Sequence, residues 1–247
     1  MADIGNSVVA ITGASSGIGA ATAQLLAARG ARVVLGARSV EPLRRLARTI
    51  TECGGSAVSA PTDVTRREDL LGLVATAREH YGRLDAIVNN AGIMPVSPLS
   101  DLKVDEWEAM VDVNLKGVLF GIAAALPVFL QQGSGHIVTV ASTAALTPLP
   151  TTSIYAATKA ALRTMSDGMR QELDGTVRVT TIVPGRTRTN FSSTTTNQQV
   201  KAQLEQRRDA RSMPPEAVAE AIAYALSQPD GVDIGEIVVR PGTPRAA

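Results

Sequence analysis

The sequence is poor in several features that would point to particular classes of protein. It has one cysteine, Cys53, among 247 residues, which excludes a disulfide within the chain and favours a reducing compartment. The formal net charge is only +1, so no long-range field selects nucleic acid or an anionic membrane surface. Aromatic residues make up 3% of the chain. Alanine, valine, leucine and isoleucine must therefore fill the core.

Long apolar runs are also scarce. Residues 1–6 contain no basic segment followed by an apolar stretch and so do not resemble a signal peptide. The longest apolar run, Gly117 to Leu130, is interrupted by Pro127 and is shorter than the roughly 20 residues that cross a bilayer. We therefore expect a cytoplasmic protein that binds a small molecule, with no metal, membrane or nucleic-acid partner.

Short β-branched runs alternate with longer stretches of helical periodicity along the whole chain. The runs are almost continuously apolar, which is typical of parallel strands covered on both faces. Strict alternation favours an α/β fold, a doubly wound seven-stranded parallel sheet flanked by helices, as one domain over residues 1–247. The expected strands are Val8–Thr12, Arg32–Ala37, Ser56–Ala60, Asp85–Val88, Gly135–Ala141, Val177–Val183 and Glu236–Val239, and the expected helices are Ile18–Arg29, Val40–Glu52, Arg66–His80, Val104–Leu130, Tyr155–Leu173 and Pro215–Gln228.

One polar segment interrupts the alternation. Residues 186–211 are rich in threonine, serine, asparagine, glutamine and arginine and separate the sixth strand from its helix. An insertion of this length in a compact domain is usually functional or mobile. We interpret residues 186–212 as a lid over a substrate, with an ordinary surface excursion as the alternative.

A glycine-rich turn follows the first strand. It reads Thr12-Gly13-Ala14-Ser15-Ser16-Gly17-Ile18-Gly19 and leads directly into a helix. Glycines allow a sharp turn close to a pyrophosphate, and the amides at the helix N-terminus attract the anion. The strand–turn–helix context favours a dinucleotide site over a tight turn without ligand. Its residues would be Gly13, Ser15, Ser16, Gly17, Ile18 and Gly19.

Tyr155 and Lys159 form the most informative pair in the chain. Residues four apart share one face of a helix, so a phenol and an ammonium would point into the same space. A nearby cation makes a phenol more acidic, which predicts a proton-transfer device with a lowered tyrosine pKa. Ser142 precedes the tyrosine by thirteen residues.

Taken in order, these motifs resemble the short-chain dehydrogenase/reductase family in its compact single-domain branch. Asn89-Asn90-Ala91-Gly92 follows the fourth strand, Asn114 lies in the long helix, and Pro184-Gly185 follows the sixth strand. The resemblance covers essentially the whole chain and implies a Rossmann fold and hydride transfer to or from a nicotinamide. It implies that the catalytic residues are Asn114, Ser142, Tyr155 and Lys159, and that Asn90, Ala91, Gly92, Pro184, Gly185, Thr187 and Thr189 contact the cofactor together with Tyr155 and Lys159.

The end of the second strand predicts which dinucleotide is bound. Arg38 and Ser39 stand where an acidic residue would select NAD. No Asp or Glu occurs between the end of the second strand, at Ala37, and Glu41. Arginine binds a 2′-phosphate well, so we predict NADP(H). The resemblance further implies that Asp63 and Val64 contact adenine, and a helix cap is the alternative for Asp63.

The substrate is less sharply defined. Mostly apolar candidates for the pocket favour a ketone, aldehyde or secondary alcohol, and the C-terminal sequence resembles the branch of 3-hydroxy acid and clavulanate-type dehydrogenases. A 3-oxoacyl-carrier-protein reductase activity and a non-catalytic dinucleotide-binding regulator are the alternatives. The resemblance also implies a homo-tetramer or dimer. The small-residue stretch 121–125 would allow close approach of helices, or would belong to the core.

Overall fold

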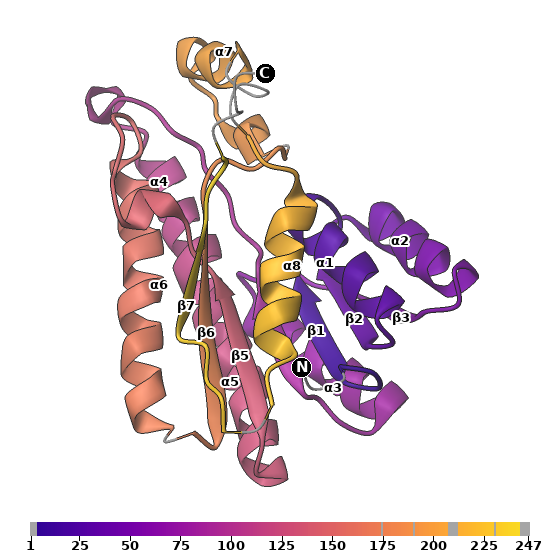
Figure 1. Cartoon of the computed structure of the whole chain (residues 1–247). Helices are drawn as coiled ribbons and strands as arrows, with labels where there is room; N and C mark the ends of the chain where they lie inside the picture. The colour runs from indigo at the N-terminus through magenta and orange to yellow at the C-terminus, as the bar shows by residue number, and fades with distance from the viewer. Residues whose placement is uncertain (1–3, 174, 190, 207–211, 230, 243–247) are drawn as a thin grey trace.

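The computed structural model describes residues 4–173, 175–189, 191–206, 212–229 and 231–242 as a single domain with one central sheet. The seven strands are all parallel and lie in the order β3-β2-β1-β4-β5-β6-β7 (Figure 1). From β1 the chain adds β2 and β3 on one side of the sheet, then crosses to add β4 to β7 on the other side. The direction in which strands are added thus reverses between β1 and β4, and ligands of such sheets bind in the crevice at that point. The strands are β1 Val8–Thr12, β2 Arg32–Ala37, β3 Ser56–Pro61, β4 Ala86–Asn89, β5 Gly135–Val140, β6 Val177–Pro184 and β7 Glu236–Val239.

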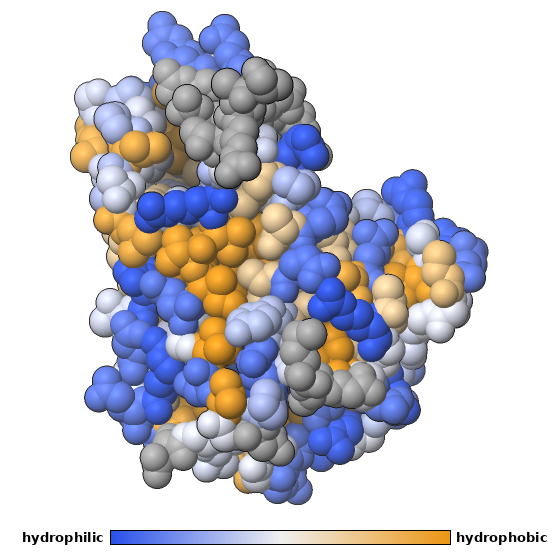
Figure 2. All heavy atoms as spheres, in the orientation of Figure 1, coloured by the Kyte–Doolittle hydropathy of each residue, from blue (hydrophilic) through white to orange (hydrophobic). Residues whose placement is uncertain are grey.

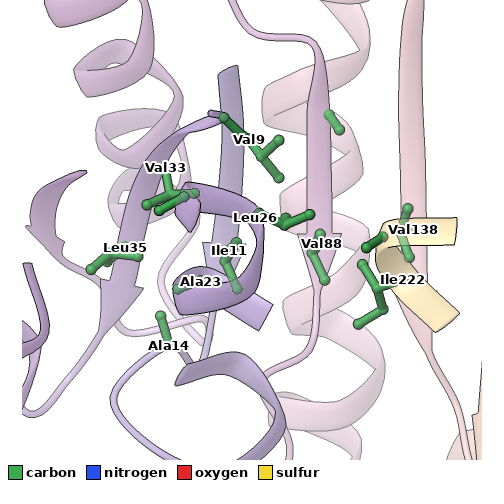
Figure 3. Close-up of a cluster of buried hydrophobic side chains, with 14 of the residues drawn as sticks. Val9, Ile11, Ala14, Ala23, Leu26, Val33, Leu35, Val88, Val138 and Ile222 are labelled. Atoms are coloured by element: carbon green, nitrogen blue, oxygen red, sulfur yellow. The ribbon is translucent and has the colours of Figure 1, made fainter. Parts of the chain in front are cut away.

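Helices cover both faces of the sheet. One apolar cluster joins the sheet to α1, α2 and α8, and Figure 3 shows Leu26 of α1 and Ile222 of α8 beside Ile11 and Val88. A second cluster joins the opposite face to α3, α5 and α6. The helices are α1 Gly17–Ala28, α2 Val40–Glu52, α3 Arg67–Tyr81, α4 Val104–Val111, α5 Gly117–Gln132, α6 Ser153–Glu172, α7 Gln198–Gln206 and α8 Pro215–Leu226.

The predicted long helix after β4 is not a uniform α-helix. A π-helical segment, Asp112–Lys116, separates α4 from α5 and carries Asn114. Gly121 follows in α5, where a Cβ would lie 2.2 Å from Asn89 Oδ1, so the sheet itself requires a glycine there. Ala124 and Ala125 are buried. This part of the small-residue stretch therefore serves the core.

By length and composition, one described helical stretch, the 29-residue Val104–Gln132, could cross a membrane. The apolar run that we predicted to be too short is thus part of a longer continuous helix. Only 44% of its most apolar window is buried inside the domain, and α5 packs against α3, β4 and β5. Core helices of soluble proteins meet the same two criteria, so the stretch gives weak support for a membrane span.

Candidate active site

The glycine-rich turn has the backbone geometry that a bound phosphate group needs. Gly13 and Gly17 adopt left-handed φ values of 66° and 56°, which disfavour any side chain. A Cβ on Gly19 would lie 2.4 Å from Gly13 O, so α1 can approach the turn only with glycine here. Ser16 caps α1 without a side-chain hydrogen bond, and the first turn carries no acidic residue. The residues present therefore fit a dinucleotide pyrophosphate.

Hydrogen bonds tie this turn to the loop after β4. Asn90 Nδ2 donates to Thr12 O at 2.9 Å, and the backbone amides of Asn90 and Ala91 donate to Thr12 Oγ1 at 3.0 and 3.1 Å. A Cβ on Gly13 would meet Ala91 Cα at 2.9 Å. The two segments predicted to line the cofactor cleft thus form one rigid unit at the carboxyl ends of β1 and β4.

Asn114 is fully buried and is hydrogen-bonded to Ile93, which lies further along the loop after β4. Its Oδ1 accepts a hydrogen bond from Ile93 N at 2.8 Å, and its Nδ2 donates to Ile93 O at 2.9 Å and to Thr158 Oγ1 at 3.3 Å. The π-helical segment displaces one residue out of the regular helix ladder and so turns this amide toward the loop. Asn114 therefore links the loop after β4 to α6.

Ser142, Tyr155 and Lys159 come together at the carboxyl end of β5. Tyr155 and Lys159 lie on the inner face of α6 and are 6% and 3% exposed. The Ser142 side chain is hydrogen-bonded to Tyr155, and Ser142 Oγ also accepts from Ala144 N at 3.1 Å. Lys159 Nζ donates to Val140 O at 2.9 Å and lies 6.0 Å from the centre of the Tyr155 ring.

The protonation equilibria of this pair differ from our expectation. Burial raises the pKa of Tyr155 to about 12, and the hydrogen bond from Ser142 opposes this only in part. Burial also lowers the pKa of Lys159 to about 8. Lys159 by itself therefore does not give the lowered tyrosine pKa that the spacing suggested; the lowering expected with an oxidised nicotinamide bound stays a prediction. Loss of hydration dominates, because the ammonium is directed to a backbone carbonyl rather than to the phenol oxygen.

The residues predicted to contact the adenosine end lie at the ends of β2 and β3. Arg38 and Ser39 are exposed, and Ser39 is the N-cap residue of α2. Asp63 Oδ1 accepts hydrogen bonds from Thr65 N at 3.0 Å and Thr65 Oγ1 at 2.8 Å, as a residue that caps a turn does. These bonds lower the pKa of Asp63 against the opposing effect of burial, helped by the charge of Arg38. Val64 is buried beside them.

The segment after β6 runs across the mouth of the cleft. Pro184 ends β6, and Gly185 N donates to Val239 O at 2.7 Å. Thr187 Oγ1 donates to Gly185 O at 3.0 Å, and Thr189 Oγ1 donates to Thr187 O at 3.5 Å. A Cβ on Gly17 would lie 3.0 Å from Thr189 Cγ2, so Thr189 rests on the start of α1.

The segment that we predicted to be a lid contacts residues of the site through its described part. Its residues 190 and 207–211 lie outside the described residues, while a 3-10 turn (Phe191–Thr194) and α7 form its described centre. Figure 1 shows α7 beyond the end of the sheet, away from both helical layers. Phe191 meets the Tyr155 ring edge-on, with centroids 6.0 Å apart at 68°. Val200 packs in the cluster that contains Tyr155 and Met110.

Polar contacts fasten the lid to the loop between β4 and α4. Thr195 Oγ1 donates to Met94 O at 3.1 Å and accepts from Val96 N at 3.5 Å, and the residue is 2% exposed. Thr194 Oγ1 accepts from Met94 N at 3.3 Å. Asn197 Nδ2 donates to Asp101 Oδ2 at 2.7 Å.

Sequence reasoning missed two residues that organise the site. Thr12 joins the glycine-rich turn to Asn90, and Thr158 receives the Asn114 amide while its hydroxyl donates to Tyr155 O at 2.7 Å. A polar residue inside an apolar strand, as at Thr12, was the available signal. Thr158 gave none, because threonine in a helix usually bonds to its own backbone. No group of three or more metal-ligand side chains gathers among the described residues.

Comparison with known proteins identifies the family. Residues 7–200 match the short chain dehydrogenase family. An uncharacterized oxidoreductase from Listeria innocua is 47% identical over 243 residues, covering 97% of this chain and 98% of that protein. The closed form of a serine dehydrogenase complexed with NADP+ superposes with a TM-score of 0.88 at 30% identity, covering 97% of this chain and 98% of that one.

A further solved structure shares the fold. A short chain dehydrogenase/reductase from Burkholderia phymatum, in complex with NAD, has a TM-score of 0.90 and 24% identity, and each chain is covered completely. Relatives of this kind are oxidoreductases, and neighbours of the same fold bind NADP or NAD. This protein is an enzyme that belongs to the short-chain dehydrogenase/reductase family.

Proposed function

We propose that the protein is an NADP(H)-dependent oxidoreductase that interconverts a ketone or aldehyde with the corresponding alcohol. The observation that carries the proposal is the grouping of the partly buried Ser142 with the buried Tyr155 and Lys159, set beside a turn built for a pyrophosphate. The bound dinucleotide would supply or accept the hydride. Gly13, Ser15, Ser16, Gly17, Ile18 and Gly19 would hold its phosphates, and Asn90, Ala91, Gly92, Pro184, Gly185, Thr187 and Thr189 its nicotinamide half.

Tyr155 would move the proton that accompanies the hydride. With a pKa raised to about 12, the phenol stays protonated at neutral pH and can donate its proton to a forming alkoxide. The Ser142 hydroxyl would stabilise the same oxygen, since an oriented donor at a developing charge is a large catalytic effect. Alcohol oxidation needs the phenolate. The bound oxidised cofactor and a charged Lys159 would have to lower the tyrosine pKa in that direction.

Lys159 and Asn114 would act around the tyrosine. Lys159 would bind the nicotinamide ribose, and its pKa near 8 leaves it mostly cationic at neutral pH. Asn114 would position the loop after β4 against α6 through its bonds to Ile93 and Thr158.

The choice of NADP over NAD depends on Arg38 and Ser39. Both side chains are exposed at the end of β2, and Arg38 is close enough to Asp63 to influence its carboxyl. Asp63 and Val64 would border the adenine. The neighbouring Glu41 is paired with Arg44 at 3.2 Å, so it points along α2. A guanidinium at this place would bind a 2′-phosphate through charge-assisted hydrogen bonds.

Arg38→Ala should therefore raise the KM for NADPH by roughly 10- to 100-fold, as loss of one charged hydrogen-bonding partner does. The KM for NADH should change less than about threefold, because NADH carries no 2′-phosphate. Arg45→Ala, which changes an exposed arginine on the following helix α2, is the control and should change neither value. Equal losses for both cofactors would contradict the assignment of Arg38.

The substrate would be a medium-sized carbonyl compound or secondary alcohol. Met94, Val96 and Phe191 gather around Tyr155 as an apolar cluster, while Leu149 is 57% exposed. The lid at residues 186–212 would cover the substrate and exclude water during hydride transfer. The branch of 3-hydroxy acid and clavulanate-type dehydrogenases is our preferred subgroup within the family.

A panel of ketones, aldehydes and alcohols, followed by NADPH absorbance at 340 nm, tests the function directly. We expect turnover of at least one apolar carbonyl substrate with NADPH. Tight NADPH binding without any turnover would favour the non-catalytic regulator. Preference for a carrier-protein-bound 3-oxoacyl substrate would favour the acyl reductase alternative.

We further propose a cytoplasmic homo-tetramer or dimer. Exposed apolar residues support an assembly: Leu119 and Leu130 on α5 are 44% and 54% exposed, and Val238 on the edge strand β7 is 42% exposed. Figure 2 shows apolar side chains gathered over the middle of one face, next to the lid. Light scattering during gel filtration would give the mass of the particle.

A further inference from the structure

Phe191 stands out because its ring lies among the residues that would receive the nicotinamide. It packs edge-on against Tyr155, and it belongs to the lid rather than to the sheet or its helices. A Cβ built on Gly92 would lie 3.5 Å from Phe191 Cζ and 3.5 Å from Lys159 Nζ. The tip of the ring and the ammonium therefore face the same side of the loop after β4.

The space between Gly92, Tyr155 and Lys159 is where the proposed function places the nicotinamide and its ribose. A phenyl ring and a nicotinamide ring are both flat six-membered rings of similar size. The tip of the Phe191 ring lies where it would contact a side chain on Gly92, so it would overlap a second ring placed against the same glycine, because protein interiors have no spare volume.

A second contact of the same segment covers the phosphate turn. Thr189 Cγ2 would be 3.0 Å from a Cβ on Gly17, the glycine that opens α1. A surface hollow of about 280 Å³ is lined by Gly17, Gln24, Arg188 and Thr189 among others; Tyr155 and Lys159 are not among its lining residues. Thr189 thus lies against the predicted phosphate turn, and Phe191 lies beside the predicted nicotinamide subsite.

Contacts that do not involve the Phe191 ring hold the described part of this segment in position, although Thr194 Oγ1 also donates to Phe191 O at 3.2 Å. Thr194 and Thr195 bond to the backbone of Met94 and Val96, and Val200 is 8% exposed within the cluster around Tyr155. Tyr155 and Lys159 are 6% and 3% exposed. A site closed this tightly must open before a dinucleotide can reach the lysine.

We propose that Phe191 is an autoinhibitory plug that occupies the nicotinamide subsite and has to be displaced when the dinucleotide binds. The inference rests on the proposed dinucleotide function. Binding then takes place in two steps, with withdrawal of the ring before the nicotinamide half can dock. The apparent affinity is reduced by the fraction of molecules in which the ring is withdrawn.

Stopped-flow binding of NADPH, followed by the fluorescence of the reduced nicotinamide, tests the plug without turnover. For the unaltered protein, the observed binding rate should level off at high NADPH concentration, at the rate of ring withdrawal. In Phe191→Ala this limit should rise at least about fivefold or disappear, and Kd should tighten roughly 2- to 10-fold, the size of effect that an aromatic edge contact has.

Val200→Ala is the matched control. It removes lid packing in the same cluster but leaves the ring, so its binding rate should still level off. If Phe191→Ala binds NADPH with the same limiting rate and Kd as the unaltered protein, or binds it more weakly, Phe191 is not a plug. If neither protein binds NADPH or NADH at all, the proposed function fails and the plug fails with it.

Discussion

Replacing Tyr155 with phenylalanine is expected to lower kcat by about three orders of magnitude, because the variant lacks the only atom that moves the proton. The fold should be unchanged. The Tyr155 hydroxyl is hydrogen-bonded to the Ser142 side chain, so its removal breaks no backbone hydrogen bond. The edge contact with Phe191 needs only the ring, which phenylalanine keeps. Dinucleotide Kd should remain within about threefold, since we assign the ribose to Lys159. Steady-state kinetics together with a fluorescence titration of NADPH would measure both quantities.

Tyr81→Phe provides the matched control. Its hydroxyl is 3.0 Å from Ser56 Oγ at the far end of α3, outside the candidate site. This variant should keep kcat within about twofold, because it loses only one partly exposed hydrogen bond. If Tyr155→Phe retained a tenth or more of the original kcat, the phenol could not be the general acid and the proposed mechanism would be wrong.

Acid should destabilise the protein through His136, well before most carboxyl groups are protonated. His136 lies in β5, is 2% exposed, and has its Nε2 at 2.8 Å from Thr180 Oγ1. Its Nδ1 is buried and has no hydrogen-bond partner among the described residues. Burial, with a smaller effect from the charge of Arg178, lowers the pKa of His136 to about 3.

The direction follows from the two pKa values. The unfolded chain takes up a proton on this histidine near pH 6.5, whereas the folded protein resists protonation until about pH 3. The contribution of the neutral, buried His136 to stability is therefore fully present above pH 6.5 and is lost as the pH falls toward 3. Between pH 6.5 and 4.5 the loss amounts to about 2–3 kcal/mol of unfolding free energy. Urea unfolding at a series of pH values would measure it.

His136→Gln removes the titration while keeping a polar group, and should flatten this part of the pH dependence even if it lowers stability overall. The other histidine, His80, is exposed on α3, where its Nδ1 lies 3.1 Å from Thr76 O of its own helix. His80→Gln should therefore leave the acid sensitivity as it is. If His136→Gln and the unaltered protein lose stability in parallel between pH 6.5 and 4.5, the buried histidine is not the cause.

The sequence alone determined the family and the elements around the sheet, but it did not predict α7 within residues 186–212. Every predicted strand and helix has a counterpart in the fold, with ends that agree within two residues except where the long helix contains the π segment. The apolar periodicity that defines strands and helices depends only on residues close together in the sequence. The same holds for the glycines of the first turn. The Tyr155–Lys159 spacing is also local, because one helical turn suffices to bring the two side chains to one face.

Only the tertiary structure decided how the parts act on one another. The raised pKa of Tyr155, the bonds from Asn114 to Ile93 and the position of Phe191 beside Gly92 all join segments distant in sequence. Burial removes water from the tyrosine and the lysine at once, and its effect outweighs the neighbouring charge that sequence spacing suggested. Hydration and packing are properties of the whole assembled site, so no pattern along the chain could have supplied them.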